Sequence, residues 1–138
     1  MIVVKERVRF VDTDMMGVVH HSNYFRWFEI ARVAYLEQAG VKLLDLLNKG
    51  YNVPVSDVRC SYKESAKYDD ELAIYARMLE LNRAKMVFSY QVRRVEDNAL
   101  LAEGVTRNVF TNKEGKIRRL PDDYYEALKA FFAKEIGV

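Results

Sequence analysis

Cysteine, proline and histidine are scarce, since the 138 residues contain one cysteine, two prolines and two histidines. The single cysteine, Cys60, excludes an internal disulfide and offers none of the paired spacing of a thiolate metal site, so we expect a cytoplasmic protein. No uninterrupted apolar run approaches the roughly 20 residues of a membrane helix. The opening MIVVKERVRF places charges straight after a short apolar run, so we expect neither a signal peptide nor membrane insertion.

An excess of one charge is also lacking. The formal net charge is +2 and no dense block of lysine and arginine occurs, so nucleic acid is not an expected partner. Half of the residues are hydrophobic and 30% are charged, which is typical of a globular protein. Because the chain has no Gly/Ser-rich linker, internal repeat or low-complexity tract, residues 1–138 are predicted to form a single domain.

The longest predicted helix runs from Ser22 to about Ala39 and stops at Gly40. Ser22 or Asn23 is expected to cap its first turn, because a short side-chain oxygen there accepts a hydrogen bond from an unpaired backbone N–H. The charged side chains share one arc of roughly 140° and the other positions are mostly apolar, so the helix should be covered on most sides. These charged residues are Arg26, Glu29, Arg32 and Glu37.

The rest of the chain is mainly β, with shorter helices expected at 41–48 and 121–135. Strands are predicted at residues 2–11, 52–66, 71–82, 85–95 and 100–111. Alternation is clearest in KMVFSYQVR, where Met86, Phe88, Tyr90 and Val92 share one face. The connections between the last four strands are short, which requires antiparallel hairpins. We therefore predict an α+β fold with an antiparallel sheet wrapped around one helix, whose open edge strands favour pairing with a second copy.

Chemistry-bearing residues gather in VDTDMMGVVHHSNYFRWFE, residues 11–29, which holds two aspartates, both histidines and the only tryptophan. Aspartate and glycine between a strand and a helix are often turn chemistry alone. The functional alternative is a carboxylate beside a helix N-terminus, where unpaired amides polarise a carbonyl and stabilise an oxyanion. The carboxylate would be Asp14, in a loop that contains Gly17, and the amides would be those around His21. The carboxylate would act as a nucleophile or as a general base on water.

A metal site is the competing interpretation of this stretch. Its ligands would be Asp12, Asp14, His20 and His21. Adjacent histidines on an extended chain point to opposite sides and no further His or Cys cluster exists, so no metal is predicted. Cys60 lies inside a predicted strand and is expected to pack there rather than react.

The same residues resemble a known signature. The pattern D-T-D-x-x-G-V-V-H-H-x-N-Y-x-R-W-F-E is similar to that of the 4-hydroxybenzoyl-CoA thioesterase family of hotdog-fold proteins, and closest to its YbgC-like, Tol–Pal-associated acyl-CoA thioesterase branch. The segments AKYDDELAI, ELNRAKMVFSYQV and RRLPDDYYEAL resemble later family segments in the same order. The resemblance implies the hotdog fold, a five-stranded antiparallel sheet around a central long helix, with a C-terminal helix added.

The resemblance also implies roles for particular residues. Asp14 matches the catalytic carboxylate, and His21 matches the residue whose backbone N–H polarises the thioester carbonyl, with its side chain able to assist. Gly17 and Val18 are implied to shape the loop around the substrate, and Tyr24 to line the site. The implied reaction needs no metal or redox cofactor, because CoA is part of the substrate.

Three further positions concern substrate recognition. Arg83 and Lys85 match a basic hairpin that contacts CoA phosphates in related enzymes, often from a neighbouring subunit; otherwise they would form a solvated turn. The acyl-CoA branch often has tyrosine where this chain has Phe10, and this departure leaves the acyl preference open.

The resemblance therefore implies an acyl-CoA thioesterase that converts acyl-CoA and water to a carboxylic acid and CoA, as a homodimer or homotetramer. Three alternatives stay open: hydrolysis of acyl groups from a carrier protein, a hotdog dehydratase, and a non-catalytic acyl-binding module of the same fold. The prominent acid precedes the helix instead of lying on it, which counts against a dehydratase.

Overall fold

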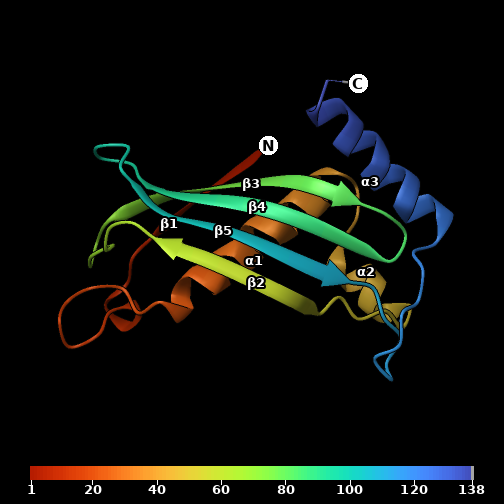
Figure 1. Ribbon diagram of the computed structural model, residues 1–138, viewed down its shortest axis with the longest axis horizontal. Helices are drawn as coiled ribbons and strands as arrows, with labels where there is room; N and C mark the ends of the chain where they lie inside the picture. The colour runs from red at the N-terminus through yellow and green to blue at the C-terminus, as the bar shows by residue number, and fades with distance from the viewer. Residues whose placement is uncertain (138) are drawn as a thin grey trace.

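The computed structural model describes residues 1–137 and contains one sheet and three α-helices within them (Figure 1). The strands are β1 (Ile2–Arg7), β2 (Val55–Tyr62), β3 (Glu71–Leu81), β4 (Lys85–Arg94) and β5 (Leu100–Val109). The helices are α1 (Ser22–Gln38), α2 (Leu43–Asn48) and α3 (Asp122–Glu135). No helix in this part of the chain is long and apolar enough to cross a bilayer.

All five strands belong to one antiparallel sheet with the order β1-β3-β4-β5-β2. The two consecutive hairpins β3–β4 and β4–β5 form its centre, because short connections bring neighbouring antiparallel strands together. β1 and β2 are the outer strands, and α1 lies across one face (Figure 1). The α+β hotdog arrangement expected from the sequence, with its C-terminal helix, is thereby confirmed.

The core lies between α1 and the helix-facing side of the sheet. Trp27, Phe28 and Tyr35 of α1 are almost fully buried. The predicted alternation in β4 is confirmed, since Met86, Phe88, Tyr90 and Val92 are all buried. Phe28 stacks on Tyr90 with ring centroids 4.4 Å apart, so the helix is tightly packed onto the middle of the sheet.

The first and second strands are shorter than predicted. β1 ends at Arg7, and Phe10–Asp12 forms a 3-10 turn. The turn forms because the Asp12 carboxylate is buried and accepts the backbone N–H of Arg9 at 2.8 Å. After Tyr62 the chain leaves the sheet, and the next two amides both donate to the carbonyl of Leu101. Both differences enlarge the loops at the end of the sheet where α1 begins.

The predicted cap of α1 is wrong. No side chain caps its first turn: the Ser22 hydroxyl instead bonds the His20 Nδ1 atom at 2.8 Å. Asn23 donates through Nδ2 to the carbonyl of Asp12 at 2.9 Å, which ties the helix start to the preceding loop. The amides of Ser22, Asn23 and Tyr24 donate to acceptors on His20 and His21, so no first-turn amide depends on a side-chain cap.

Arg32 also departs from the predicted exposed arc, because it is 8% exposed. Its Nη1 atom donates to the Tyr90 hydroxyl at 3.0 Å, and that hydroxyl shares a 2.7 Å hydrogen bond with Thr106 Oγ1. Helical periodicity placed Arg32 with the charged residues, but the sheet partners draw it inward.

Candidate active site

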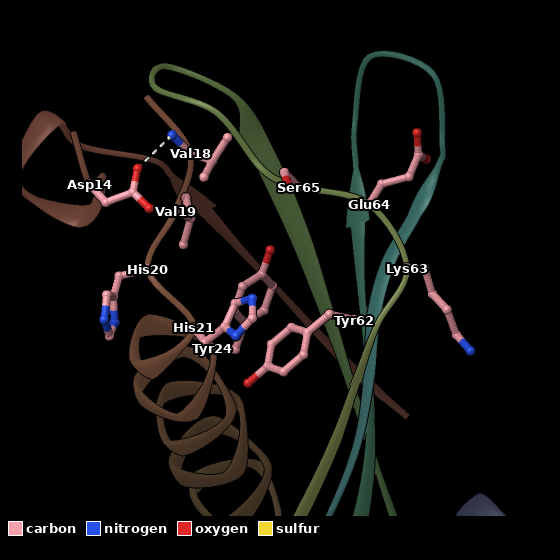
Figure 2. Close-up of a pocket in the computed structure, with 10 residues that line it drawn as sticks. All are labelled: Asp14, Val18, Val19, His20, His21, Tyr24, Tyr62, Lys63, Glu64 and Ser65. Carbon is pink, nitrogen blue, oxygen red and sulfur yellow. Dashed lines mark hydrogen bonds between the residues drawn. The ribbon is translucent and has the colours of Figure 1, made fainter. Parts of the chain in front are cut away.

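A cavity of about 360 Å³ opens where the β1–α1 loop, the start of α1 and the segment after β2 meet (Figure 2). Ten residues line it: Asp14, Val18, Val19, His20, His21, Tyr24, Tyr62, Lys63, Glu64 and Ser65. Of the site residues predicted from the sequence, the fold brings four together here, namely Asp14, Val18, His21 and Tyr24.

Asp14 is exposed at the cavity and its carboxylate is held from one side only. Its Oδ1 atom accepts the backbone N–H of Met16 at 2.8 Å. The same atom accepts the backbone N–H of Val18 at 3.4 Å (Figure 2). Within residues 1–137 its Oδ2 atom accepts no hydrogen bond. The carboxylate is therefore oriented by the loop while one oxygen stays free to react.

Gly17 makes this loop possible but does not line the cavity. Its φ of +77° lies in the left-handed region that favours glycine, and its N–H donates to the Asp14 carbonyl at 3.1 Å. Gly17 thus has a conformational role in the loop and Val18 lines the cavity, while contact of Gly17 with a substrate stays a prediction.

His21 lies immediately before α1 and presents a free donor. In the described part of the chain its backbone N–H donates no hydrogen bond, although neighbouring amides do. An unpaired amide at the positive end of a helix is a suitable partner for a carbonyl oxygen that gains negative charge. Asp14 and His21 therefore place a carboxylate with a free oxygen and an unpaired amide at one cavity.

The His21 side chain is fixed by an aromatic residue that sequence patterns did not single out. Its ring stacks on Tyr62, with centroids 3.8 Å apart and planes 9° apart. Tyr24 meets the same Tyr62 ring edge-on at 5.2 Å. Burial is the main cause that raises the pKa of Tyr62 to about 12, and the neighbouring Cys60 side chain adds to it, so the phenol stays protonated. No local motif marks Tyr62; its position at the end of β2 brings it to the site.

Asp12 and His20 take supporting positions. Asp12 is 2% exposed and its Oδ1 accepts Arg26 Nη2 at 2.9 Å, so the carboxylate is paired within the fold. His20 lines the cavity but its Nδ1 bonds Ser22. Among residues 1–137, no group of three or more His, Cys, Asp or Glu side chains is arranged to hold a metal ion.

Cys60 lies on β2 next to the hydrophobic core. Burial raises the pKa of its thiol above the ordinary value, which disfavours the reactive thiolate. This agrees with the expected packing role.

Arg83 and Lys85 do not approach this cavity within one chain. They lie at the opposite end of the sheet, because β3 starts beside the cavity and runs ten residue steps, or about 33 Å, before the β3–β4 turn. Arg83 Nη1 pairs with Asp122 at 2.5 Å, and its guanidinium lies over the Tyr125 ring. Lys85 pairs with Glu80 at 3.1 Å.

The chain matches a known protein family over most of its length. The family model of the thioesterase-like superfamily matches residues 8–128, which include the Asp14 loop, the whole β3–β4 hairpin and the first half of α3. The chain belongs to this superfamily.

Several members are similar over nearly their whole length. Acyl-CoA thioesterase YbgC of Haemophilus influenzae is 31% identical over 91% of this chain and 90% of its own. A crystal structure of a hypothetical protein from Thermus thermophilus has a TM-score of 0.87 at 35% identity, covering 95% of this chain and 99% of that one. A crystal structure of a 4-hydroxybenzoyl-CoA thioesterase variant in complex with 4-hydroxybenzoyl-CoA has a TM-score of 0.81 at 26% identity. The match covers 92% of this chain and 97% of that one.

Proposed function

We propose that this protein hydrolyses acyl-CoA thioesters to the free carboxylic acid and CoA. The observation that carries the proposal is the pairing, in one cavity, of a carboxylate with a free oxygen at Asp14 and an unpaired amide at His21. The names of the YbgC and 4-hydroxybenzoyl-CoA relatives support thioesters of CoA as the substrate class.

In the proposed reaction, the thioester carbonyl oxygen accepts the His21 N–H, which stabilises the negative charge that develops during attack. The free Asp14 oxygen either attacks the carbonyl carbon or removes a proton from the attacking water. In the first case an acyl–aspartate anhydride forms, CoA thiolate leaves, and water then cleaves the anhydride. In the second case water adds directly and the same thiolate leaves. Val18 and Tyr24 border the reacting group in both cases.

No further cofactor is required in this scheme. A thiolate is a good leaving group, so one oriented carboxylate and one amide donor supply what the chemistry needs. CoA enters and leaves as part of the substrate.

The proposal includes a second copy of the chain. Arg83 and Lys85, the basic hairpin residues, lie about 33 Å along the sheet from the cavity of their own chain, so they can serve a CoA phosphate only at a neighbouring cavity. Pairing along an open outer strand would give a homodimer, and two dimers a homotetramer.

The test is a hydrolysis panel of short, long and aromatic acyl-CoAs, read by thiol release, on the wild type and on Asp14→Asn. We expect kcat to fall by roughly a thousandfold or more in Asp14→Asn, with an unchanged thermal midpoint, because the carboxylate is exposed and makes few structural contacts. Near-normal activity of this variant on the best substrate would refute the role of Asp14, and no activity of the wild type on any thioester would refute the function.

The basic hairpin has its own test. Lys85→Met should raise KM several-fold for an acyl-CoA and leave KM unchanged for the matched acyl-N-acetylcysteamine thioester, which lacks the phosphates. Equal effects on both substrates would show that Lys85 does not bind the nucleotide.

A further inference from the structure

The loop between β1 and α1, which carries the reactive carboxylate, is held at its start by a short turn before β3, residues 67–70, here called the 67–70 turn. The Val8 amide donates to the Asp70 carbonyl at 2.9 Å, and the Asp69 amide donates to the Val8 carbonyl at 3.0 Å. These two bonds extend the antiparallel pairing of β1 with β3 by one residue. The turn therefore fixes the point at which the loop leaves the sheet.

The same turn and the residue before it also hold the end of the loop. Val18 forms an antiparallel bridge with Lys67, and the Val19 amide donates to the Ala66 carbonyl at 2.8 Å. The Val18 amide in turn donates to Oδ1 of Asp14 at 3.4 Å. The orientation of the reactive carboxylate therefore depends on where the turn places the backbone of Lys67 and Ala66.

The side chain of Asp70 closes the 67–70 turn. Its Oδ2 atom accepts the backbone N–H of Lys67 at 2.9 Å, and its own backbone N–H donates to the Lys67 carbonyl at 3.1 Å. Between these residues Asp69 has a φ of +69°, in the left-handed region that costs energy for a residue with a side chain. The bonds of Asp70 offset this cost and keep the turn in a conformation that the backbone alone disfavours.

Arg94 of β4 orients the Asp70 carboxylate from inside the sheet. Its Nη1 atom lies 3.8 Å from Asp70 Oδ2, and the two side chains are only 16% and 19% exposed. Its other two nitrogens donate to the Asp97 carboxylate, Nε at 3.0 Å and Nη2 at 2.8 Å. Because partly buried charges are screened less by water and salt than exposed ones, this pairing restricts the Asp70 side chain.

We propose that Asp70 is a positioning residue for the hydrolysis: it fixes the 67–70 turn and thereby holds the Asp14 carboxylate in its reactive orientation. This role rests on the proposed thioesterase function and adds to it a residue that does not line the cavity. Asp97 provides a matched control, because it binds the same Arg94 guanidinium but, among residues 1–137, makes no hydrogen bond to the loop.

The experiment compares the kinetics of Asp70→Ala, Asp70→Asn and Asp97→Ala with those of the wild type on its best acyl-CoA. Rates are expressed per folded molecule, with the folded fraction taken from circular dichroism. In Asp70→Ala we expect kcat to fall roughly ten- to a hundredfold with KM nearly unchanged, because a displaced carboxylate loses rate and not substrate binding. Asp70→Asn keeps an oxygen that can accept the Lys67 amide, so it should retain most of kcat. Asp97→Ala should retain the wild-type kcat.

Amide hydrogen exchange provides a second readout that does not depend on turnover. The Val19 amide, which donates to Ala66, should exchange at least about tenfold faster in Asp70→Ala than in the wild type, while the amides of β4 keep their protection. In Asp70→Asn and Asp97→Ala the Val19 amide should stay protected. If no acyl-CoA is hydrolysed, the proposed function fails, and these exchange rates still decide whether Asp70 holds the loop.

Three results would overturn the inference. The first is a wild-type kcat per folded molecule in Asp70→Ala, which would leave Asp70 with a role in stability alone. The second is an equal loss of kcat in Asp70→Ala and Asp97→Ala, which would assign the effect to the Arg94 ion pairs and not to the turn. The third is an unchanged exchange rate of the Val19 amide in Asp70→Ala.

Discussion

The imidazole of His21 lies flat on the phenol ring of Tyr62, with centroids 3.8 Å apart and planes 9° apart. This stack joins the residue before α1 to the last residue of β2, two elements that meet only in the folded chain. It fixes the position of the residue whose amide is the candidate oxyanion donor. Tyr62 is thus a positioning residue for the site.

Loss of the Tyr62 ring should therefore impair catalysis more than loss of its hydroxyl. In Tyr62→Leu we expect kcat to fall roughly ten- to a hundredfold with little change in KM, because misplaced groups lose much of their rate advantage. Tyr62→Phe keeps the ring and should remain close to wild type. The ring-current shift of the His21 protons in NMR spectra should persist in Tyr62→Phe and disappear in Tyr62→Leu. A similar loss of kcat in both variants would instead assign the effect to the hydroxyl.

Substitution of Asp12 should lower stability and largely spare activity, which is the opposite of the effect expected for substitution of Asp14. Its buried carboxylate accepts both Arg26 and the amide of Arg9, so Asp12→Asn should lower the free energy of unfolding by about 1–3 kcal/mol. Activity per folded molecule should stay within a few-fold of wild type, because the side chain is paired within the fold and does not line the cavity. Urea unfolding and initial rates on one preparation check both parts. A stable but inactive Asp12→Asn protein would contradict the division of roles between the two aspartates.

Gly104 leaves room for the helix against the sheet. A Cβ atom there would lie 2.4 Å from the ring of Phe28, which is fully buried and stacked on Tyr90 and so has little freedom to move. Gly104→Ala should cost about 1–3 kcal/mol of stability through overpacking. In the Phe28→Leu background the same substitution should cost less, as a double-mutant cycle would show. An equal cost in both backgrounds would exclude this clash as the cause.

Alkaline pH should destabilise the fold. Burial raises the pKa of Tyr24, Tyr62 and Tyr90 above the usual 10.0, to about 12 for Tyr62. The folded protein therefore keeps protons that the unfolded chain releases, so this contribution is complete below pH 10 and is lost as pH rises from 10 through 12. Urea unfolding across this window should show decreasing stability, with a smaller decrease in Tyr62→Phe than in the exposed control Tyr68→Phe. A free energy of unfolding that increases above pH 10 would contradict the raised pKa values of these tyrosines.

The sequence by itself determined the order and type of the elements. Period-two alternation in β4 and the apolar circumference of α1 are local patterns, and short connections leave antiparallel hairpins as the geometric choice. The motif around Asp14 and His21 was readable for the same reason, because a loop followed by a helix start is contiguous in the chain. Asp14, Val18, His21 and Tyr24 accordingly line one cavity.

The tertiary structure alone decided which distant groups act on that motif. Tyr62 reaches His21 through the position of β2 at the sheet edge, and Arg32 turns inward because Tyr90 and Thr106 lie opposite it. The helix cap was predicted wrongly because the Ser22 hydroxyl bonds His20, while the amide of His21 has no hydrogen-bond partner among residues 1–137. Sequence periodicity predicts which face of a helix or strand is turned toward the core. Residues on neighbouring elements decide which polar groups find hydrogen-bond partners and which remain free for a substrate.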